Sequence, residues 1–204
     1  MSFKLPGLVY GVTCREYPAS SLFYQQFDYR YWVSMKQIHS STCVVVTPEM
    51  LSQDKHVLIE NADAIITKEQ GVLLSVRTAD CLPILIAHES GVVGAVHAGR
   101  KGTESEIIIE TLRSIKENFG ELDGLKFWFG PAICEACYQI DRELDLHYDL
   151  VDENKKQIAS VLKSGTYEIT ESGLCTVERT DMFYSYRKEG ELAGRLQSYI
   201  GFLC

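Results

Sequence analysis

The chain has 204 residues, of which 46% are hydrophobic and 24% charged, and this balance is typical of a globular protein rather than a disordered or fibrous one. Its 20 basic and 28 acidic residues give a net charge of −8, which argues against binding to the phosphate backbone of nucleic acids. The length favours one domain, which we expect to span residues 1–204.

The first half of the sequence predicts short strands, because its apolar runs are rich in valine and isoleucine and are bounded by glycine, proline, aspartate or asparagine. The expected strands are Leu8–Cys14, Tyr31–Gln37, Thr42–Thr47, Ala62–Thr67, Val72–Arg77, Pro83–His88 and Val92–His97. Several of these runs are almost continuously apolar, which indicates strands that are covered on both faces. Pro6, Gly7 and Gly11 interrupt the N-terminal run, so we interpret it as a first strand rather than a signal peptide.

The second half mixes helices with strands. Thr103 and Glu106 match a capping box ahead of an apolar stripe that ends before Gly120, and they predict a helix that begins at Thr103. The other expected elements are a strand at Leu125–Phe129, a helix at Asp152–Lys163, an extended segment at Met182–Tyr186 and a last helix at Leu192–Ile200. This order predicts an α/β fold, in which one domain has mixed β-sheet layers with helices packed outside.

The cysteine content indicates a reducing environment. The seven cysteines are an odd number and no export signal is recognisable, so we expect free thiols and a cytoplasmic location. No apolar run approaches the roughly 18 residues that a membrane span needs, so no membrane partner is expected. Cys134 and Cys137 have the C-x-x-C spacing of metal or redox sites, but they lack a second such pair, and we do not favour either use.

Three candidate metal ligands lie at the ends of apolar strands: His39, Cys81 and His97. Strand ends converge on one rim of a sheet, where a thiolate and two imidazoles would leave a fourth position open to water. This set suits catalytic Zn²⁺, and copper also accepts both ligand types. The wide spacing leaves alternatives open: a buried cysteine beside two hydrogen-bonded histidines, a Cys81–His97 pair for nucleophilic catalysis, or a structural metal.

A second feature is the loop that follows His97. Gly99 and Gly102 flank Arg100 and Lys101 ahead of the expected helix at Thr103, and a glycine-rich turn entering a helix favours an anion such as phosphate. Asp80, next to Cys81, is a candidate for orienting an imidazole or moving a proton, with a simple turn cap as the alternative.

These segments belong to a longer series of motifs in a fixed order. The series reads Gln37-Ile38-His39, Ala62-Asp63-Ala64-Ile65-Ile66-Thr67, Thr78-Ala79-Asp80-Cys81-Leu82-Pro83, His97-Ala98-Gly99-Arg100-Lys101-Gly102-Thr103, Gly130-Pro131-Ala132-Ile133 with Tyr138, Cys175-Thr176, and Phe183-Tyr184-Ser185-Tyr186-Arg187-Lys188 with Gly194-Arg195. In this order the chain resembles the YfiH/YlmD-type family, which is known both as laccase-like multicopper polyphenol oxidase and as purine nucleoside phosphorylase, and whose animal members are called FAMIN.

The resemblance implies a single α/β domain with His39, Cys81 and His97 as metal ligands. It implies zinc-dependent phosphorolysis of adenosine, inosine, guanosine and methylthioadenosine, together with deamination of adenosine. Copper-dependent oxidation of phenols is the family's other activity and remains an alternative, as does a Cys–His amidase-type hydrolase. The expected partners are a purine nucleoside and phosphate, and the expected assembly is a monomer or homodimer.

The residues themselves and, for Ser185, Arg187 and Arg15, the resemblance assign roles to further positions. Asp80, Cys81 and His97 are the expected catalytic residues, and the expected substrate or phosphate contacts are Arg100, Lys101, Thr103, Ser185, Arg187 and Arg15. The chain departs from the family in two places. The family's Trp-Arg pair is replaced by Arg100-Lys101, and the N-terminal segment is shortened, so that only Thr13-Cys14-Arg15 matches the family's first motif.

Overall fold

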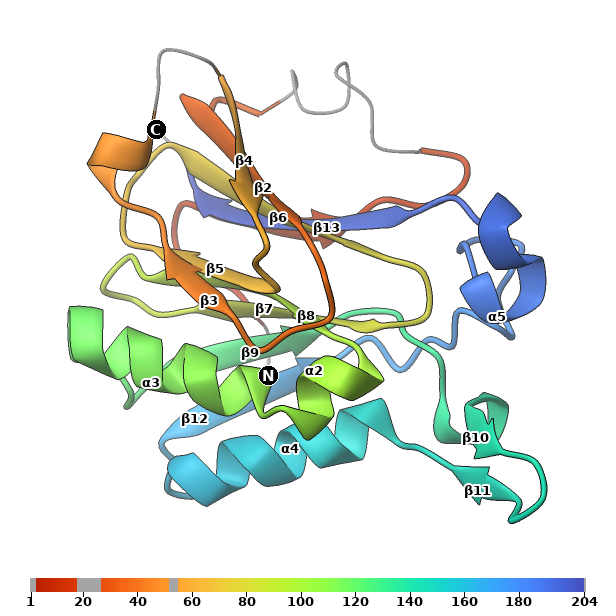
Figure 1. Cartoon of the computed structure of the whole chain (residues 1–204). Helices are drawn as coiled ribbons and strands as arrows, with labels where there is room; N and C mark the ends of the chain where they lie inside the picture. The colour runs from red at the N-terminus through yellow and green to blue at the C-terminus, as the bar shows by residue number, and fades with distance from the viewer. Residues whose placement is uncertain (1–2, 18–26, 52–54, 204) are drawn as a thin grey trace.

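The protein forms three layers in a computed structural model that describes residues 3–17, 27–51 and 55–203 (Figure 1). A five-stranded sheet of order β1-β13-β6-β2-β4 packs on a six-stranded sheet of order β12-β9-β7-β8-β5-β3, and helices α3 and α4 cover the outer face of the second sheet. The elements are β1 (Leu8–Val12), β2 (Tyr31–Lys36), β3 (Cys43–Val45), η1 (Pro48–Met50), β4 (His56–Glu60), β5 (Ala64–Thr67), β6 (Val72–Thr78), β7 (Leu82–Ala87), β8 (Val93–Ala98), α2 (Arg100–Glu104), α3 (Ile107–Phe119), β9 (Leu125–Phe129), η2 (Glu135–Cys137), β10 (Gln139–Asp141), β11 (Leu146–His147), α4 (Leu150–Val161), β12 (Tyr167–Glu171), α5 (Tyr186–Glu189), η3 (Gly190–Leu192) and β13 (Leu196–Phe202).

The six-stranded sheet is buried on both faces. Along β7, Ile84 and Ile86 point into the core under the helices, where they meet Ile108 of α3. Leu85, between them in sequence, belongs to the core between the two sheets. The continuous apolar run of β7 therefore follows from burial on both sides, because successive side chains of a strand point to opposite faces. The expected α/β class with mixed sheets and outer helices is confirmed.

The predicted strands of the first half and the strand at Leu125–Phe129 are confirmed with small shifts at their ends. The prediction that Thr103 and Glu106 form a capping box is wrong. Thr103 lies inside α2, where its buried hydroxyl accepts a hydrogen bond from Asn154, and α3 starts only after Glu106, which has a left-handed backbone with φ of 62°. The chain therefore makes two short helical segments where the apolar pattern predicts one helix.

The predicted last helix at Leu192–Ile200 is also wrong, because this segment forms β13. Leu196 and Ile200 are four residues apart, as on a helix face, but both are buried in a strand that pairs with β1 on one side and β6 on the other. At Gly201, an added Cβ would lie 2.4 Å from the carbonyl oxygen of Val72, so the close pairing itself requires glycine. Tertiary pairing here overrides the local pattern.

The expected extended segment at Met182–Tyr186 gives way to helix α5 at Tyr186, and the sequence pattern missed β4, β10, β11 and β12. These four strands are short or lie at sheet edges, where few apolar residues mark them. Among the described residues, none of the helices has the length and apolar character that crossing a bilayer requires.

Candidate active site

The three predicted metal ligands meet at one point. His39 lies in the loop after β2, Cys81 in the turn between β6 and β7, and His97 near the end of β8. Their ligand atoms all lie within 4.8 Å of one another. Sγ of Cys81 is 3.9 Å from Nε2 of His39, and the two imidazole rings meet edge to face with centroids 4.7 Å apart. The arrangement is therefore a group that could hold one metal ion.

A buried carboxylate supports this group from behind. Nδ1 of His97 lies 2.8 Å from Oδ1 of Asp63, whose side chain is fully buried. The same carboxylate accepts hydrogen bonds from the backbone N–H groups of Ile38, His39 and Ser40, and from the hydroxyl of Ser40. One side chain thus orients His97 and holds the loop that carries His39. A carboxylate behind a ligating histidine fixes the ring and its tautomer in many metal sites.

The electrostatics of the group favour a thiolate. Burial raises the pKa of Cys81, but hydrogen bonds and charge from His39 and His97 outweigh it and lower that pKa to about 6. Burial acts against the charge of His97 as well, yet its bonds to Asp63 and Cys81 raise its pKa to about 9. For Asp63, the bonds from His97 and Ser40 overcome desolvation and lower the pKa to about 2. A deprotonated thiol is the form that binds metals or acts as a nucleophile.

The backbone around the ligands is tightly constrained. His39 and Asp80 both have positive φ angles, of 62° and 85°, a conformation that costs energy for residues other than glycine and is often found at functional sites. Gly99 passes directly beside the ligands: a Cβ added there would lie 2.9 Å from Sγ of Cys81 and 3.1 Å from Cδ2 of His39. Glycine at this position gives the thiol and the imidazole the space they occupy.

Asp80 does not contact either imidazole. Its Oδ1 accepts a hydrogen bond of 2.7 Å from the hydroxyl of Thr176, and its Oδ2 accepts one of 2.6 Å from the backbone N–H of Arg187. The carboxylate that sequence reasoning expected at Asp80 is supplied instead by Asp63. Asp80 therefore holds Thr176 and the first turn of α5 against the turn between β6 and β7 that carries Cys81.

The metal group opens into a cleft of about 1020 Å³. The polar lining of the cleft is mainly basic: Lys36, Arg77, Arg100, Lys101, Arg187 and Arg195. Two acidic residues, Asp80 and Glu191, also line it. The clustering of positive charge is notable in a chain with a net charge of −8, and it favours an anionic guest.

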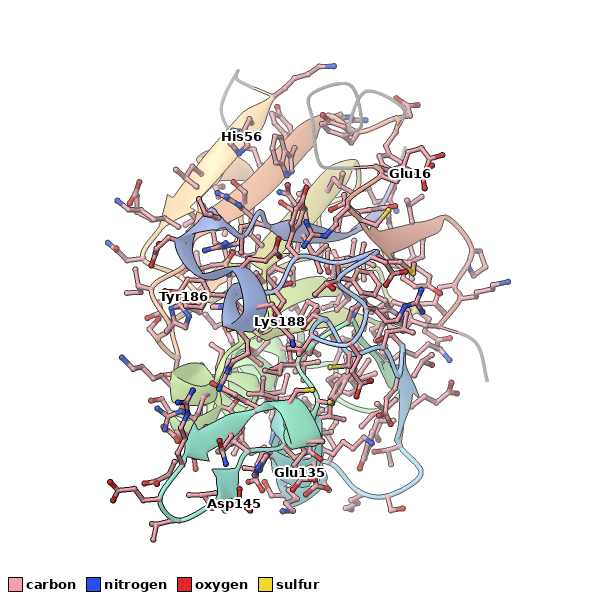
Figure 2. All side chains as sticks on the ribbon, turned by 90° about the vertical axis from the view of Figure 1, so that its right-hand side faces the viewer. Glu16, His56, Glu135, Asp145, Tyr186 and Lys188 are labelled. Atoms are coloured by element: carbon pink, nitrogen blue, oxygen red, sulfur yellow. The ribbon has the colours of Figure 1, made fainter. Side chains whose placement is uncertain are left out.

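Two tyrosines complete the cleft wall. Tyr138 and Tyr186 both line the cleft, and the guanidinium groups of Arg187 and Arg195 lie over their rings at 5.4 and 5.9 Å from the centroids, respectively. Figure 2 looks onto this edge of the molecule, with Tyr186 and Lys188 on α5 above Glu135 and Asp145. The cleft therefore offers flat aromatic faces close to cationic groups, a combination that suits a planar base carrying or accompanying an anion.

The structure separates the predicted substrate contacts into two groups. Arg100, Lys101 and Arg187 line the cleft, whereas Arg15, Thr103 and Ser185 are not among its lining residues. The guanidinium of Arg15 donates to Glu189 and to the carbonyl of Phe183 and lies over the ring of Tyr184. Thr103 and Ser185 are both fully buried, and Ser185 caps α5. These three residues therefore build the walls around the cleft.

Sequence reasoning missed the roles of Asp63, which lies behind the candidate ligands, and of Arg77, which lines the cleft. Asp63 belongs to the motif that runs from Ala62 to Thr67. The motif does not reveal the role of Asp63, because its partner His97 lies 34 residues away. Arg77 is held by Gln37, which accepts from its backbone N–H and donates to its carbonyl. The only available signal was position, since Arg77 is the next-to-last residue of β6, just before the turn that carries Cys81.

Comparison with known proteins identifies the family. The family described as multi-copper polyphenol oxidoreductase laccase matches residues 19–203. The chain belongs to this family. Its fold agrees with that of YlmD from Geobacillus stearothermophilus, with a TM-score of 0.82 at 23% identity over 97% of this chain and 93% of that one. YfiH from Bacillus licheniformis gives a TM-score of 0.75 at 22% identity, over 88% and 77% of the two chains.

Curated relatives of this family member carry enzyme names. A purine nucleoside phosphorylase of Campylobacter jejuni is 32% identical over 170 residues, which is 77% of this chain and 71% of the relative. The purine nucleoside phosphorylase YlmD of Bacillus subtilis is 30% identical over 199 residues, 85% and 72% of the two chains. The adenosine deaminase RL5, from an unknown prokaryotic organism, is 27% identical over 188 residues, 80% and 72% of the two.

Proposed function

We propose that this chain is a metal-dependent purine nucleoside phosphorylase. In this reaction the N-glycosidic bond of the nucleoside breaks, a bond forms between the anomeric carbon and a phosphate oxygen, and the proton of hydrogen phosphate ends on the purine. The observation that carries the proposal is the meeting of His39, Cys81 and His97 at the floor of a basic cleft. Relatives named as purine nucleoside phosphorylases, at about 30% identity, support the same activity.

We propose zinc as the metal. One thiolate and two imidazoles with an open fourth position match catalytic zinc sites, and the carboxylate of Asp63 behind His97 fits the support that such sites use. His39, Cys81 and His97 would hold the ion, which supplies Lewis acidity when it is bound.

The basic residues of the cleft would bind phosphate. Lys101 and Arg77 are exposed and make no ion pair with any residue that the structure describes, so their charges remain available to an anion. The backbone of Arg187 is fixed by Asp80, which places its guanidinium at the cleft wall beside Tyr138. Holding phosphate and nucleoside together in reacting orientation can supply roughly 7–11 kcal/mol of the barrier.

The tyrosines would hold the purine. Tyr138 and Tyr186 present rings to the cleft, and offset stacking on a planar base is a favourable use of such rings. All six cysteines in the described part of the chain are free thiols, which supports the proposal that the enzyme works in the cytoplasm.

The test is incubation of metal-analysed protein with adenosine and phosphate, followed by chromatography. Free adenine and ribose 1-phosphate, formed only when phosphate is present, are the expected products. The variant His97→Ala should abolish turnover, whereas His56→Ala, which changes an exposed histidine of β4 outside the cleft, should leave it unchanged. Turnover that survives in His97→Ala would refute the assignment.

Two other outcomes would replace the proposal. Inosine formed from adenosine without phosphate would make the chain a deaminase, an activity named for one relative. Oxygen uptake with a phenol after copper loading, without any nucleoside turnover, would favour the oxidase for which the family is named.

A further inference from the structure

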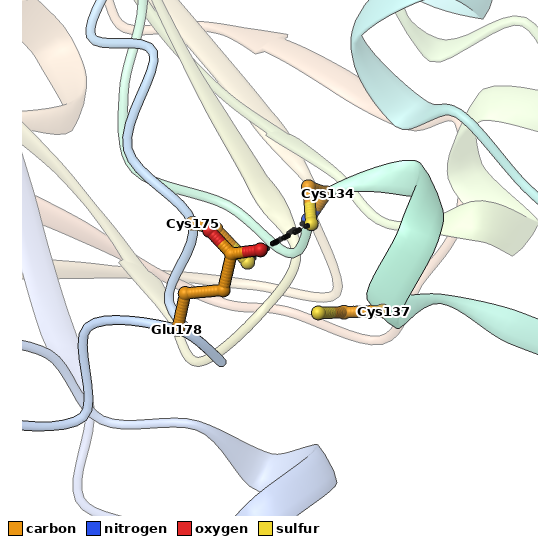
Figure 3. Close-up of side chains that lie close together, drawn as sticks. All are labelled: Cys134, Cys137, Cys175 and Glu178. Atoms are coloured by element: carbon orange, nitrogen blue, oxygen red, sulfur yellow. Dashed lines mark hydrogen bonds between the residues drawn. The ribbon is translucent and has the colours of Figure 1, made fainter.

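A second cluster of metal-ligating side chains lies outside the cleft lining. It consists of Cys134, Cys137, Cys175 and Glu178, and their ligand atoms all lie within 4.8 Å of one another (Figure 3). Cys134 directly precedes η2 and Cys137 is its last residue, whereas Cys175 and Glu178 come from the segment after β12. The C-x-x-C pair, which has no second pair in the sequence, thus finds its partners about 40 residues further along the chain.

Backbone pairing brings these two segments together without help from the side chains. Ala132 forms a parallel bridge with Cys175, through its N–H to the carbonyl of Leu174 and its carbonyl to the N–H of Thr176. The N–H of Cys134 points at Sγ of Cys175, at 3.4 Å, and Sγ of Cys134 lies 3.9 Å from Oε1 of Glu178. The four side chains are therefore arranged by the fold before any ion binds.

The geometry fits a tetrahedral zinc ion. Zinc–sulfur bonds of about 2.3 Å place the sulfur atoms of a tetrahedral site about 3.8 Å apart. The present limit of 4.8 Å between ligand atoms requires shifts of about 1 Å, within reach of side-chain rotation. The C-x-x-C spacing is the one that structural zinc sites commonly use, and cysteine thiolates with a carboxylate are zinc ligands.

We propose that Cys134, Cys137, Cys175 and Glu178 form a structural zinc site. Its four protein ligands complete the coordination shell, in contrast to the three ligands at the cleft floor, so this ion would bind no substrate. The ion would act as a clamp in the sense that it links Cys134 and Cys137, in the segment after β9, to Cys175 and Glu178, in the segment after β12.

The clamp would act on the wall of the cleft. Thr176, next to Cys175, donates its hydroxyl to Oδ1 of Asp80, and the N–H of Ile133, next to Cys134, donates to the carbonyl of Asp80. Asp80 in turn holds the backbone of Arg187 and adjoins Cys81. Two of the proposed zinc ligands, Cys134 and Cys175, are therefore the sequence neighbours of residues that hold Asp80, and Asp80 precedes Cys81.

The test is a count of zinc per chain in protein loaded with zinc and freed of excess ion. The double variant Cys134→Ser/Cys137→Ser should bind one equivalent less than the wild type, and Cys14→Ser, a matched change in a cysteine of neither cluster, should bind as much as the wild type. His97→Ala should lose the other equivalent and keep this one. Equal zinc content in wild type and the double variant would overturn the proposal.

A second measurement needs no cysteine variant and so does not depend on the double variant folding. In His97→Ala protein loaded with cobalt, the three thiolates should give thiolate-to-metal charge-transfer absorption, and zinc should displace it. Zinc should also protect Cys134, Cys137 and Cys175 together from alkylation. Absence of both effects, or a Cys134–Cys137 disulfide in protein kept under reducing conditions, would contradict a zinc site.

Discussion

The carboxylate of Asp63 lies 2.8 Å from Nδ1 of His97, and both side chains are buried. The same carboxylate receives three backbone N–H groups from the loop that carries His39. Two of the three candidate metal ligands are thus positioned by one side chain that is not itself in the group.

Asp63→Asn should therefore weaken both the metal site and the fold. The amide places an N–H group opposite backbone donors, so we expect a loss of about 2 kcal/mol in the free energy of unfolding, and a roughly 10–100-fold loss in zinc affinity. Zinc titration and denaturant unfolding measure the two effects. Asp181→Asn, on an exposed pair with Arg179, is the matched control and should change neither. Unchanged zinc affinity in Asp63→Asn would remove Asp63 from the site.

The same carboxylate predicts an acid-dependent stability in the metal-free protein. The pKa of Asp63 falls to about 2 from an ordinary value of 3.8, because hydrogen bonds from His97 and Ser40 outweigh its burial. A lowered folded-state pKa contributes stability that is complete above about pH 5 and is lost as the pH falls towards 2, on the order of 2 kcal/mol. The unfolding free energies of the wild type and Asp63→Asn should therefore converge over this range. A difference that stays constant down to pH 2 would contradict the prediction.

In the metal-free protein, the alkylation rates of Cys81 and Cys43 should depend differently on pH. With its pKa lowered to about 6, Cys81 is a thiolate at pH 7, and its alkylation rate should fall about tenfold per pH unit only below that pKa. Burial raises the pKa of Cys43 to about 11, so its alkylation should still be increasing with pH at pH 9. Mass spectrometry of alkylated peptides measures both rates. Zinc should protect Cys81 and leave Cys43 unaffected; equal rates for the two thiols would refute the electrostatic argument.

Gly99→Ala should disable the site through a single added methyl group. The new Cβ would lie 2.9 Å from Sγ of Cys81 and 3.1 Å from Cδ2 of His39, closer than contact allows, so the thiol must shift from its place in the group. We expect weak zinc binding and loss of nucleoside turnover in a folded protein. Gly94→Ala, on the strand β8 that precedes Gly99, is the matched control, since its Cβ would meet Ile66 at 3.1 Å, away from the site. That variant should lose stability by overpacking but keep its metal.

Lys101→Ala should affect phosphate more than nucleoside. If Lys101 binds phosphate, its removal costs a charge-assisted hydrogen bond, and the KM for phosphate should rise about tenfold or more. Lys188→Ala, on α5 and outside the cleft lining, is the control and should leave both KM values unchanged. An equal rise in both KM values for Lys101→Ala would place this lysine elsewhere in the reaction.

The meeting of the three candidate ligands could be predicted from sequence, whereas the support from Asp63 could not. His39, Cys81 and His97 stand at ends of apolar strands, and strand ends are visible as a change from apolar to polar residues. The role of Asp63 depends on a contact with His97 across a strand pair, β5 with β8, and no local pattern records such a pairing. Asp80 shows how little adjacency says about contacts, because its carboxylate, next to Cys81 in sequence, accepts hydrogen bonds from Thr176 and Arg187 rather than from an imidazole.

The same difference between a local pattern and a distant contact explains which strands could be predicted from the sequence. β7 was predictable because burial on both faces leaves a continuous apolar run in the sequence. β13 was not, because its spacing of Leu196 and Ile200 also fits a helix and only its two neighbouring strands decide the matter. Cys134 and Cys137 were recognisable as a pair, but Cys175 joins them through a single backbone bridge formed far along the chain.

His39 follows a strand of the five-stranded sheet, and His97 belongs to the six-stranded sheet. An ion held by both histidines would therefore join the two halves of the sandwich, and its binding energy would add to their cohesion. Heating would then release metal and separate the sheets in one cooperative event, so the midpoint temperature of melting would rise with the concentration of free zinc.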